Sequence, residues 1–145
     1  MNHRIAILSD IHGDTTALEA VIADARALGA TEYWLLGDIL LPGPGREDLF
    51  DLLDAIPITA AVRGNWDDCV LEALDGEYGL EDPQEIQLLR LTQYLMEGLD
   101  TKRIDWLRSL PLVEKKEVNG IRFSLSHNLP EKNYGGAVSY THLRA

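Results

Sequence analysis

The first part of the chain alternates between two patterns of apolar residues, and this alternation constrains the fold more than any other feature. Short apolar runs at 4–8, 33–36 and 58–62 have the length and composition of buried strands. Between them, 16–28 and 47–56 carry apolar residues at helical spacing. Strands that alternate with helices form a parallel sheet through right-handed crossovers. The sequence therefore predicts an α/β fold.

The ends of the first helix carry their own signals. Thr16 and Glu19 have the spacing of a capping box, and Gly29 directly follows the last apolar residue of the pattern. We therefore expect this helix to begin at Thr16.

The middle of the chain shows no strand pattern. From about 67 to 110 it carries helical patterns at 68–74, 83–97 and 101–109. Such an all-helical insertion is typical of a cap over a site, and equally of helices that only cover a sheet. Both interpretations stay open.

Strand patterns return after this segment. The runs 112–118 and 121–126 are joined by Asn119-Gly120, and this dipeptide between two apolar runs is a strong hairpin signal. These two runs are therefore expected to form an antiparallel pair.

A polar cluster follows four of the predicted strands. Asp10 and His12 follow the first, Asp38 the second, Asn65 the third and His127 the last. Ligands of open α/β sheets bind beyond the carboxyl ends of the strands, so these side chains should converge on one edge. Each motif alone is typical of a turn or a helix cap. Their order, each after a strand, favours a joint site.

The residue types indicate a metal site. Two aspartates, two histidines and an asparagine form a mixed oxygen and nitrogen set, which suits manganese, iron, cobalt or zinc better than calcium. One carboxylate, Asp38, can bridge two ions. Two metals roughly 3.5–4 Å apart can hold a hydroxide between them and stabilise its attack on phosphorus.

Composition excludes several classes of protein. A formal charge of −11 argues against binding to nucleic acid polymers or anionic lipid, although the same charge also serves solubility. No apolar run approaches the roughly 20 residues that span a bilayer, and the first residues lack a secretory pattern. The single cysteine, Cys69, fits a reducing compartment. We expect a cytoplasmic protein without membrane partners.

These motifs closely resemble those of the calcineurin-like metallophosphoesterase superfamily. The segments that carry the resemblance are 8–13 (LSDIHG), 36–38 (LGD), 63–65 (RGN) and 126–127 (SH). The stretch 35–45 (LLGDILLPGPG) and the helical insertion are similar to bacterial phosphodiesterases related to asymmetric diadenosine tetraphosphate hydrolases.

The resemblance implies a site and an architecture. It implies that Asp10 and His12 bind a first divalent metal ion, that Asp38 bridges, and that Asn65 and His127 bind a second. Manganese is the first expectation for both ions, with iron, cobalt or zinc as alternatives. The implied fold is the N-terminal part of a two-sheet sandwich flanked by helices, with a helical cap insertion.

The resemblance also implies that the domain is incomplete. The closing Gly-His-x-His motif of the superfamily, which gives each metal one more histidine, is absent. We expect residues 1–136 to form an incomplete, C-terminally truncated domain that contains the insertion 67–110. Residues 137–145 resemble a translated sequencing-adapter tail, so His142 is not expected to be a native ligand.

Trp66 stands where many members of the superfamily have a histidine that protonates the leaving oxygen. Loss of a general acid costs roughly 10²–10⁴ in rate on poor leaving groups. Nucleoside polyphosphates and aryl phosphodiesters leave as weakly basic anions, and Trp66 therefore favours them over alkyl phosphomonoesters. Residues 39–45 lack the arginine of the protein phosphatases, which argues against that branch.

Two functions from different classes follow. The first is metal-dependent hydrolysis of phosphodiester or nucleoside polyphosphate bonds in a small substrate such as a dinucleoside polyphosphate. The alternative is an inactive, phosphoesterase-like module that binds metal or nucleotide. For the chain as written it is a serious rival, because each metal lacks one histidine. A dinucleotide-binding domain fits worst, since no Gly-x-Gly-x-x-Gly follows the first strand.

Overall fold

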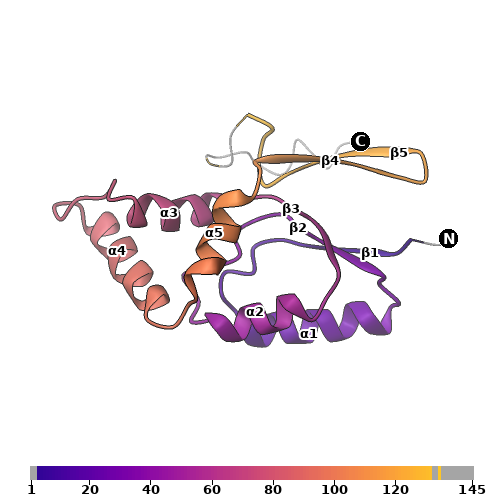
Figure 1. Cartoon of the computed structure of the whole chain (residues 1–145), viewed down its shortest axis with the longest axis horizontal. Coiled ribbons are helices and arrows are strands. Elements are labelled where there is room, and N and C mark those ends of the chain that lie inside the picture. The colour runs from indigo at the N-terminus through magenta and orange to yellow at the C-terminus, as the bar shows by residue number, and fades with distance from the viewer. Residues whose placement is uncertain (1–2, 132–133, 135–145) are drawn as a thin grey trace.

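The computed structural model describes residues 3–131 and 134 (Figure 1). Its elements confirm the predicted mixed α/β class, with a parallel sheet, a second antiparallel sheet and flanking helices. In chain order they are β1 (Ile5–Leu8), α1 (Thr15–Ala27), β2 (Glu32–Leu35), α2 (Glu47–Asp54), β3 (Ile58–Ala61), α3 (Asn65–Leu74), α4 (Pro83–Met96), α5 (Thr101–Ser109), β4 (Val113–Val118) and β5 (Ile121–Ser126).

The three parallel strands lie in the order β1-β2-β3, so β2 is central. Side chains alternate between the two faces of a strand. Tyr33 and Leu35 therefore belong to the core on the helical side, whereas Trp34 belongs to the core on the side of the hairpin. Because the three strands run parallel, their carboxyl ends lie at the same edge of the sheet.

One hydrophobic core joins the sheet to all five described helices. Figure 1 shows α1 and α2 along one side of the sheet and α3, α4 and α5 at its end. Val70, Leu95 and Leu107, one from each of the last three helices, are fully buried in the core that contains Leu35. These helices therefore share a core with the sheet.

The β4-β5 hairpin covers the other face of the sheet. Trp34 packs edge to face against Phe123, with ring centroids 5.2 Å apart, and Leu125 is buried in the same small cluster. The predicted turn is confirmed, because Asn119 and Gly120 have φ angles of 52° and 79°, as a type I′ turn requires. The two layers form a sandwich.

Two helices begin elsewhere than the sequence predicts. The capping box at Thr16 is wrong: α1 begins at Thr15, and the Asp14 carboxylate caps it by accepting a hydrogen bond from the Ala17 amide at 2.9 Å. Helix α3 begins at Asn65, because the Asp67 carboxylate accepts the Gly64 amide and caps the helix there.

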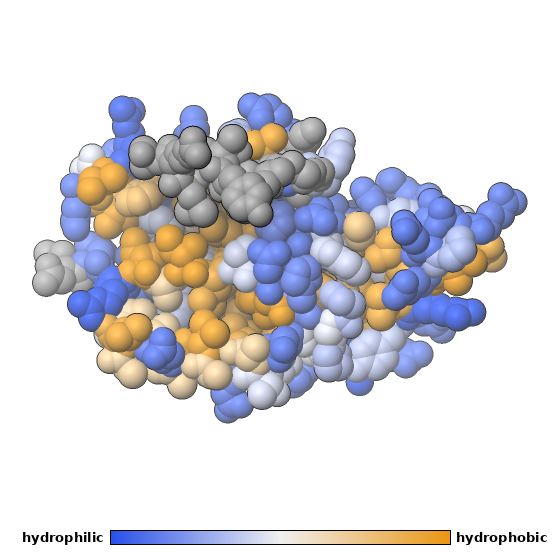
Figure 2. Space-filling model, turned by 180° about the vertical axis from the view of Figure 1, so that it is seen from behind, coloured by the Kyte–Doolittle hydropathy of each residue, from blue (hydrophilic) through white to orange (hydrophobic). Residues whose placement is uncertain are grey.

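The outer surface has an apolar region over β1 and α1. Ile7, Val21 and Leu28 are each between 45% and 60% exposed, and the view from behind shows apolar surface gathered in this half of the molecule (Figure 2). Among the described strands, β1 pairs only with β2, so its other edge is open.

Across residues 3–131 no helix combines the length and the apolar character that a membrane crossing requires. The expected tail 137–145, with His142, lies outside the described residues.

Candidate metal centre

The loops that follow β1 and β2 are joined at the edge of the sheet by backbone hydrogen bonds. The amide of Asp10 donates to the Gly37 carbonyl at 3.1 Å, and the amide of His12 donates to the Asp38 carbonyl at 2.9 Å. These bonds continue the pairing of the strands into the loops. They bring Asp10, His12 and Asp38 to one place.

Three residues at this edge adopt an unusual backbone conformation. Asp10, His12 and Asp38 have φ angles of 57°, 51° and 55°, in the left-handed region that side chains other than glycine seldom enter. Each such residue costs of order 1 kcal/mol or more, and such residues cluster at functional sites. The loops therefore hold these side chains in place at a cost in stability.

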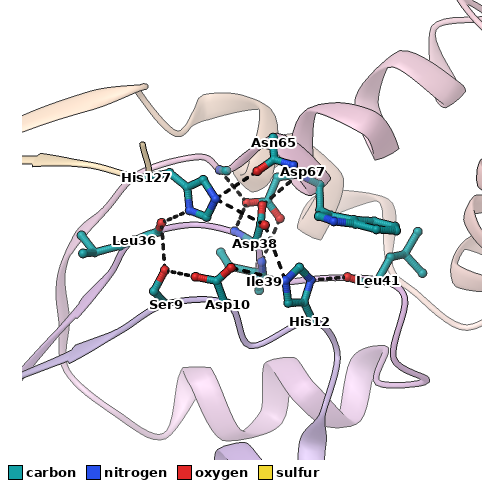
Figure 3. A network of polar contacts seen from close by, with 12 residues as sticks. Ser9, Asp10, His12, Leu36, Asp38, Ile39, Leu41, Asn65, Asp67 and His127 are labelled. Carbon is teal, nitrogen blue, oxygen red and sulfur yellow. Dashed lines mark hydrogen bonds and ion pairs between the residues drawn. The ribbon is translucent and has the colours of Figure 1, made fainter. Parts of the chain in front are cut away.

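The first group of the site consists of Asp10, His12 and Asp38 (Figure 3). One ligand atom from each lies within 4.8 Å of the others. His12 Nε2 is 3.4 Å from Asp10 Oδ1 and 3.5 Å from Asp38 Oδ2. The Ser9 hydroxyl donates to Asp10 Oδ2 at 2.6 Å and so orients that carboxylate.

The orientation of the His12 ring is fixed from behind. His12 Nδ1 lies 2.8 Å from the Leu41 carbonyl, which can only accept, so Nδ1 carries the proton. Nε2 is then the ring nitrogen that faces the two carboxylates. A backbone carbonyl behind the ring is a usual partner of a metal-binding histidine.

The second group consists of Asn65 and His127, together with Asp38. His127 Nε2 lies 3.0 Å from Asn65 Oδ1 and 3.3 Å from Asp38 Oδ2, and its Nδ1 donates to the Leu36 carbonyl at 2.6 Å. The hydrogen bond with Asp38 raises the pKa of His127 to about 9, against the opposing effect of burial. Asp38 Oδ2 thus lies between two histidines, in the position of a bridging ligand.

We call these five residues, Asp10, His12, Asp38, Asn65 and His127, the strand-end cluster. The structure brings all five together, as their positions after the strands predict. Their role as ligands stays a prediction.

Asp67 supports the cluster. From the sequence, a structural role at a helix start and a role as substitute general acid are equally open, and neither indicates the partners that the structure shows. Its side chain is fully buried, and its two oxygens accept hydrogen bonds from the amides of Asp38, Ile39 and Gly64 at 2.8–2.9 Å. Burial raises the pKa of Asp67 to about 6, although the amide bonds act in the opposite direction. With three backbone partners it joins two loops and is unsuited to act as a general acid.

A second support lies in the loop after Asp38. The amide of Gly43 donates to the His12 carbonyl and that of Gly45 to the Gly13 carbonyl, both at 2.8 Å. A Cβ on Gly43 would collide with the His12 carbonyl oxygen, so only glycine permits this approach. The loop 42–45 therefore lies behind His12.

The cluster fits a divalent cation. Ligands at about 2.0–2.2 Å from one ion lie at most about 4.4 Å apart, close to the separations of the first group. Asp38 is 2% exposed, and its ion pairs within the described residues are with His12 and His127 rather than with lysine or arginine. A buried carboxylate needs compensating charge, which His127 supplies in the absence of metal and which a bound cation would supply in its place.

Trp66 closes one side of the cluster. Its backbone amide donates to Asp38 Oδ1 at 2.8 Å, and its ring meets the His12 ring edge-on with centroids 5.8 Å apart. An indole holds no proton that it can give to a leaving group. Its ring instead packs against the edge of the His12 ring.

A family model described as calcineurin-like phosphoesterase matches residues 3–143. The chain belongs to this family. A curated relative, uncharacterized protein MJ0912 of Methanocaldococcus jannaschii, is 30% identical over 131 residues, which cover 88% of this chain and 50% of that protein.

Solved structures agree with the assignment to the calcineurin-like phosphoesterase family. A metallophosphoesterase from Sphaerobacter thermophilus is 28% identical with a TM-score of 0.66, over 92% of this chain and 50% of that one. Protein PH1004 from Pyrococcus horikoshii is 20% identical with a TM-score of 0.68, over 90% and 56%, and shows the fold alone. This chain of the family thus spans about half the length of these relatives.

Proposed function

We propose that the chain supplies the metal-binding edge of a metal-dependent hydrolase that acts on phosphoester bonds. The observation that supports this most is the position of Asp38 Oδ2, which lies 3.5 Å from His12 Nε2 and 3.3 Å from His127 Nε2. One buried carboxylate oxygen between two imidazoles is the arrangement that two neighbouring cations need.

In this proposal Asp10 and His12 hold a first ion, Asn65 and His127 a second, and Asp38 both. Divalent ions held there would polarise the phosphoryl group of the substrate and lower the pKa of bound water. Manganese is our first expectation, ahead of iron, cobalt and zinc, because the ligands are oxygens and imidazoles without thiolate.

Neighbouring groups orient the two histidines of the cluster, and Trp66 limits the choice of substrate. The carbonyls of Leu41 and Leu36 hold the Nδ1 protons of His12 and His127, so that both Nε2 atoms face Asp38. Trp66 packs against the His12 ring and offers no proton to the leaving oxygen. Substrates with weakly basic leaving groups therefore suit this site: aryl phosphodiesters and nucleoside polyphosphates, including dinucleoside polyphosphates.

We further propose the domain division that the sequence indicates, with the strand-end cluster in a phosphoesterase domain over 1–136 and the helical segment 67–110 within it. The core shared by Val70, Leu95 and Leu107 with the sheet supports a covering role for these helices.

An assay of the whole protein with manganese tests the proposal. We expect saturable hydrolysis of bis(p-nitrophenyl) phosphate and of diadenosine tetraphosphate that a chelator abolishes. Alkyl phosphomonoesters should react more slowly by a factor of roughly 10²–10⁴. Manganese binding without turnover of either substrate would contradict the proposal and favour a non-catalytic binding module.

A further inference from the structure

A cavity of about 380 Å³ opens between α3 and α4, next to the strand-end cluster. Asn65 and Trp66 belong to both places. Asn65 lines the cavity while its Oδ1 lies 3.0 Å from His127 Nε2, and Trp66 lines it while its amide donates to Asp38 Oδ1. The start of α3 is therefore a wall that the cluster and the cavity share.

The inner walls of the cavity suit a flat aromatic group. Trp66 provides an indole on the side of α3, and Leu88 and Leu91 provide apolar surface on the side of α4. An aromatic side chain is the usual platform on which a nucleobase stacks. The volume lies within the range of about 300–1,000 Å³ typical of ligand pockets.

The rim carries two amides. Gln84 and Gln87 lie one helical turn apart on α4, and within the described residues neither side-chain amide has a hydrogen-bond partner. Each amide offers both donors and an acceptor. This is the combination that pairs with the edge of a base, as glutamine does with adenine.

Charge separates the cavity from the cluster. The residues that line the cavity include no lysine, arginine, histidine, aspartate or glutamate. A phosphate would find no cation there, whereas an uncharged ring would meet no unpaired charge. The phosphate of a nucleotide therefore belongs at the strand-end cluster and its base in the cavity.

We propose that the cavity between α3 and α4 binds the nucleobase of a nucleotide substrate whose phosphate lies at the strand-end cluster. This inference rests on the proposed function and narrows its substrate class to nucleoside phosphoesters. Trp66 then has a role in binding at the position where it cannot act as an acid.

Calorimetric binding of two probes to the whole protein with manganese tests this. Adenosine 5′-monophosphate and ribose 5-phosphate carry the same phosphate and sugar, and only the first has a base. We expect adenosine 5′-monophosphate to bind about tenfold more tightly or better, the effect of one stacked base. Leu88→Trp fills the cavity. It should remove the preference for adenosine 5′-monophosphate without weakening the binding of ribose 5-phosphate.

Leu80→Trp is the matched control, because Leu80 is 79% exposed in the loop before α4 and lies outside the cavity. It should keep the preference, and thermal melts should show that both variants fold. Equal binding of the two probes, no binding of either, or a preference that survives Leu88→Trp overturns the inference. Hydrolysis of bis(p-nitrophenyl) phosphate is measured in parallel. If it persists while the inference about the cavity fails, the proposed function still stands.

Discussion

Among single residues, Asp38 has the most connected position in the site. It follows the central strand, is 2% exposed, and has one oxygen between His12 and His127. Its other oxygen accepts the Trp66 amide at 2.8 Å. A change at Asp38 therefore reaches both halves of the strand-end cluster at once.

We predict that Asp38→Asn weakens manganese binding by at least about 100-fold. Changes to the partners of metal ligands already cost roughly 10–100-fold, and this change removes the charge of a shared ligand while keeping its shape. Calorimetric titration with manganese measures the effect. Asp14→Asn is the matched control, since asparagine caps a helix as well as aspartate does. Unchanged manganese affinity in Asp38→Asn would rule out the bridging role.

Asp67 has a different task at the same scale. Both of its oxygens accept backbone amides, and an asparagine would present an NH₂ group to amides that can only donate. We predict that Asp67→Asn lowers the free energy of unfolding by about 2–3 kcal/mol. Urea denaturation measures this, with Asp82→Asn at the exposed cap of α4 as control. A loss no larger than in the control would show that Asp67 is not a support.

The sequence predicted which residues come together in the cluster, but not the groups that hold their side chains in position. Asp10, Asp38 and Asn65 each follow a strand, and parallel topology alone brings strand ends together. The role of Asp67 depends on where α3 begins and on two loops meeting, which no local pattern shows. The carbonyl partners of His12 and His127 are equally hidden, since any residue can supply a carbonyl.

At the scale of elements, Arg103 joins α5 to α2. Its guanidinium lies 2.8 Å from Glu47 and 2.7 Å from Asp54, and it packs over the Phe50 ring at 4.7 Å. The hydrogen bonds from Arg103 lower the pKa of both carboxyls. Lowered pKa values in the folded state give stability that is present above the usual carboxyl range and is lost as pH falls through the lowered values.

We predict that Arg103→Gln lowers the free energy of unfolding at pH 7 by about 1 kcal/mol, because solvent screens the partly exposed carboxyls. The difference from the unchanged protein should shrink as pH falls below about 4. Urea denaturation at several pH values measures it. Lys102→Gln, on the same helix with an exposed partner, should change little. A difference independent of pH would contradict the electrostatic account.

The existence of the elements followed from periodicity, whereas their ends followed only where turn residues or caps mark them clearly. The hairpin strand Ile121–Ser126 and helix α5 agree with the pattern, because turn residues and caps bound them clearly. Helix α1 begins earlier than the pattern predicts, because Asp14 rather than Thr16 caps it. The packing of α3, α4 and α5 into the main core depends on long-range contacts, so the pattern left a lid and a cover equally open.

At the scale of the whole molecule, β1 and α1 present apolar side chains to solvent. Ile7 is 55% exposed on β1, which among the described strands pairs only with β2, and Val21 is 45% exposed on α1. Open edges and exposed apolar patches promote association between chains.

We predict that the 145-residue chain self-associates at micromolar concentration and that Ile7→Lys reduces this. A lysine on an edge strand places a charge where a second strand would pair. Light scattering after size exclusion measures the mass. Leu80→Lys, at a site 79% exposed but far from β1 in the sequence, should leave association unchanged. If the chain without the substitution is monomeric, this surface does not mediate association.

The proposed function requires a cation at the strand-end cluster. Anomalous diffraction from crystals of the protein grown with manganese tests this most directly. We predict a manganese peak at about 2.0–2.2 Å from ligand atoms of Asp10, His12 and Asp38, with a second peak next to Asn65 and His127. Crystals that hold manganese elsewhere, with the cluster free of any peak, would contradict the account.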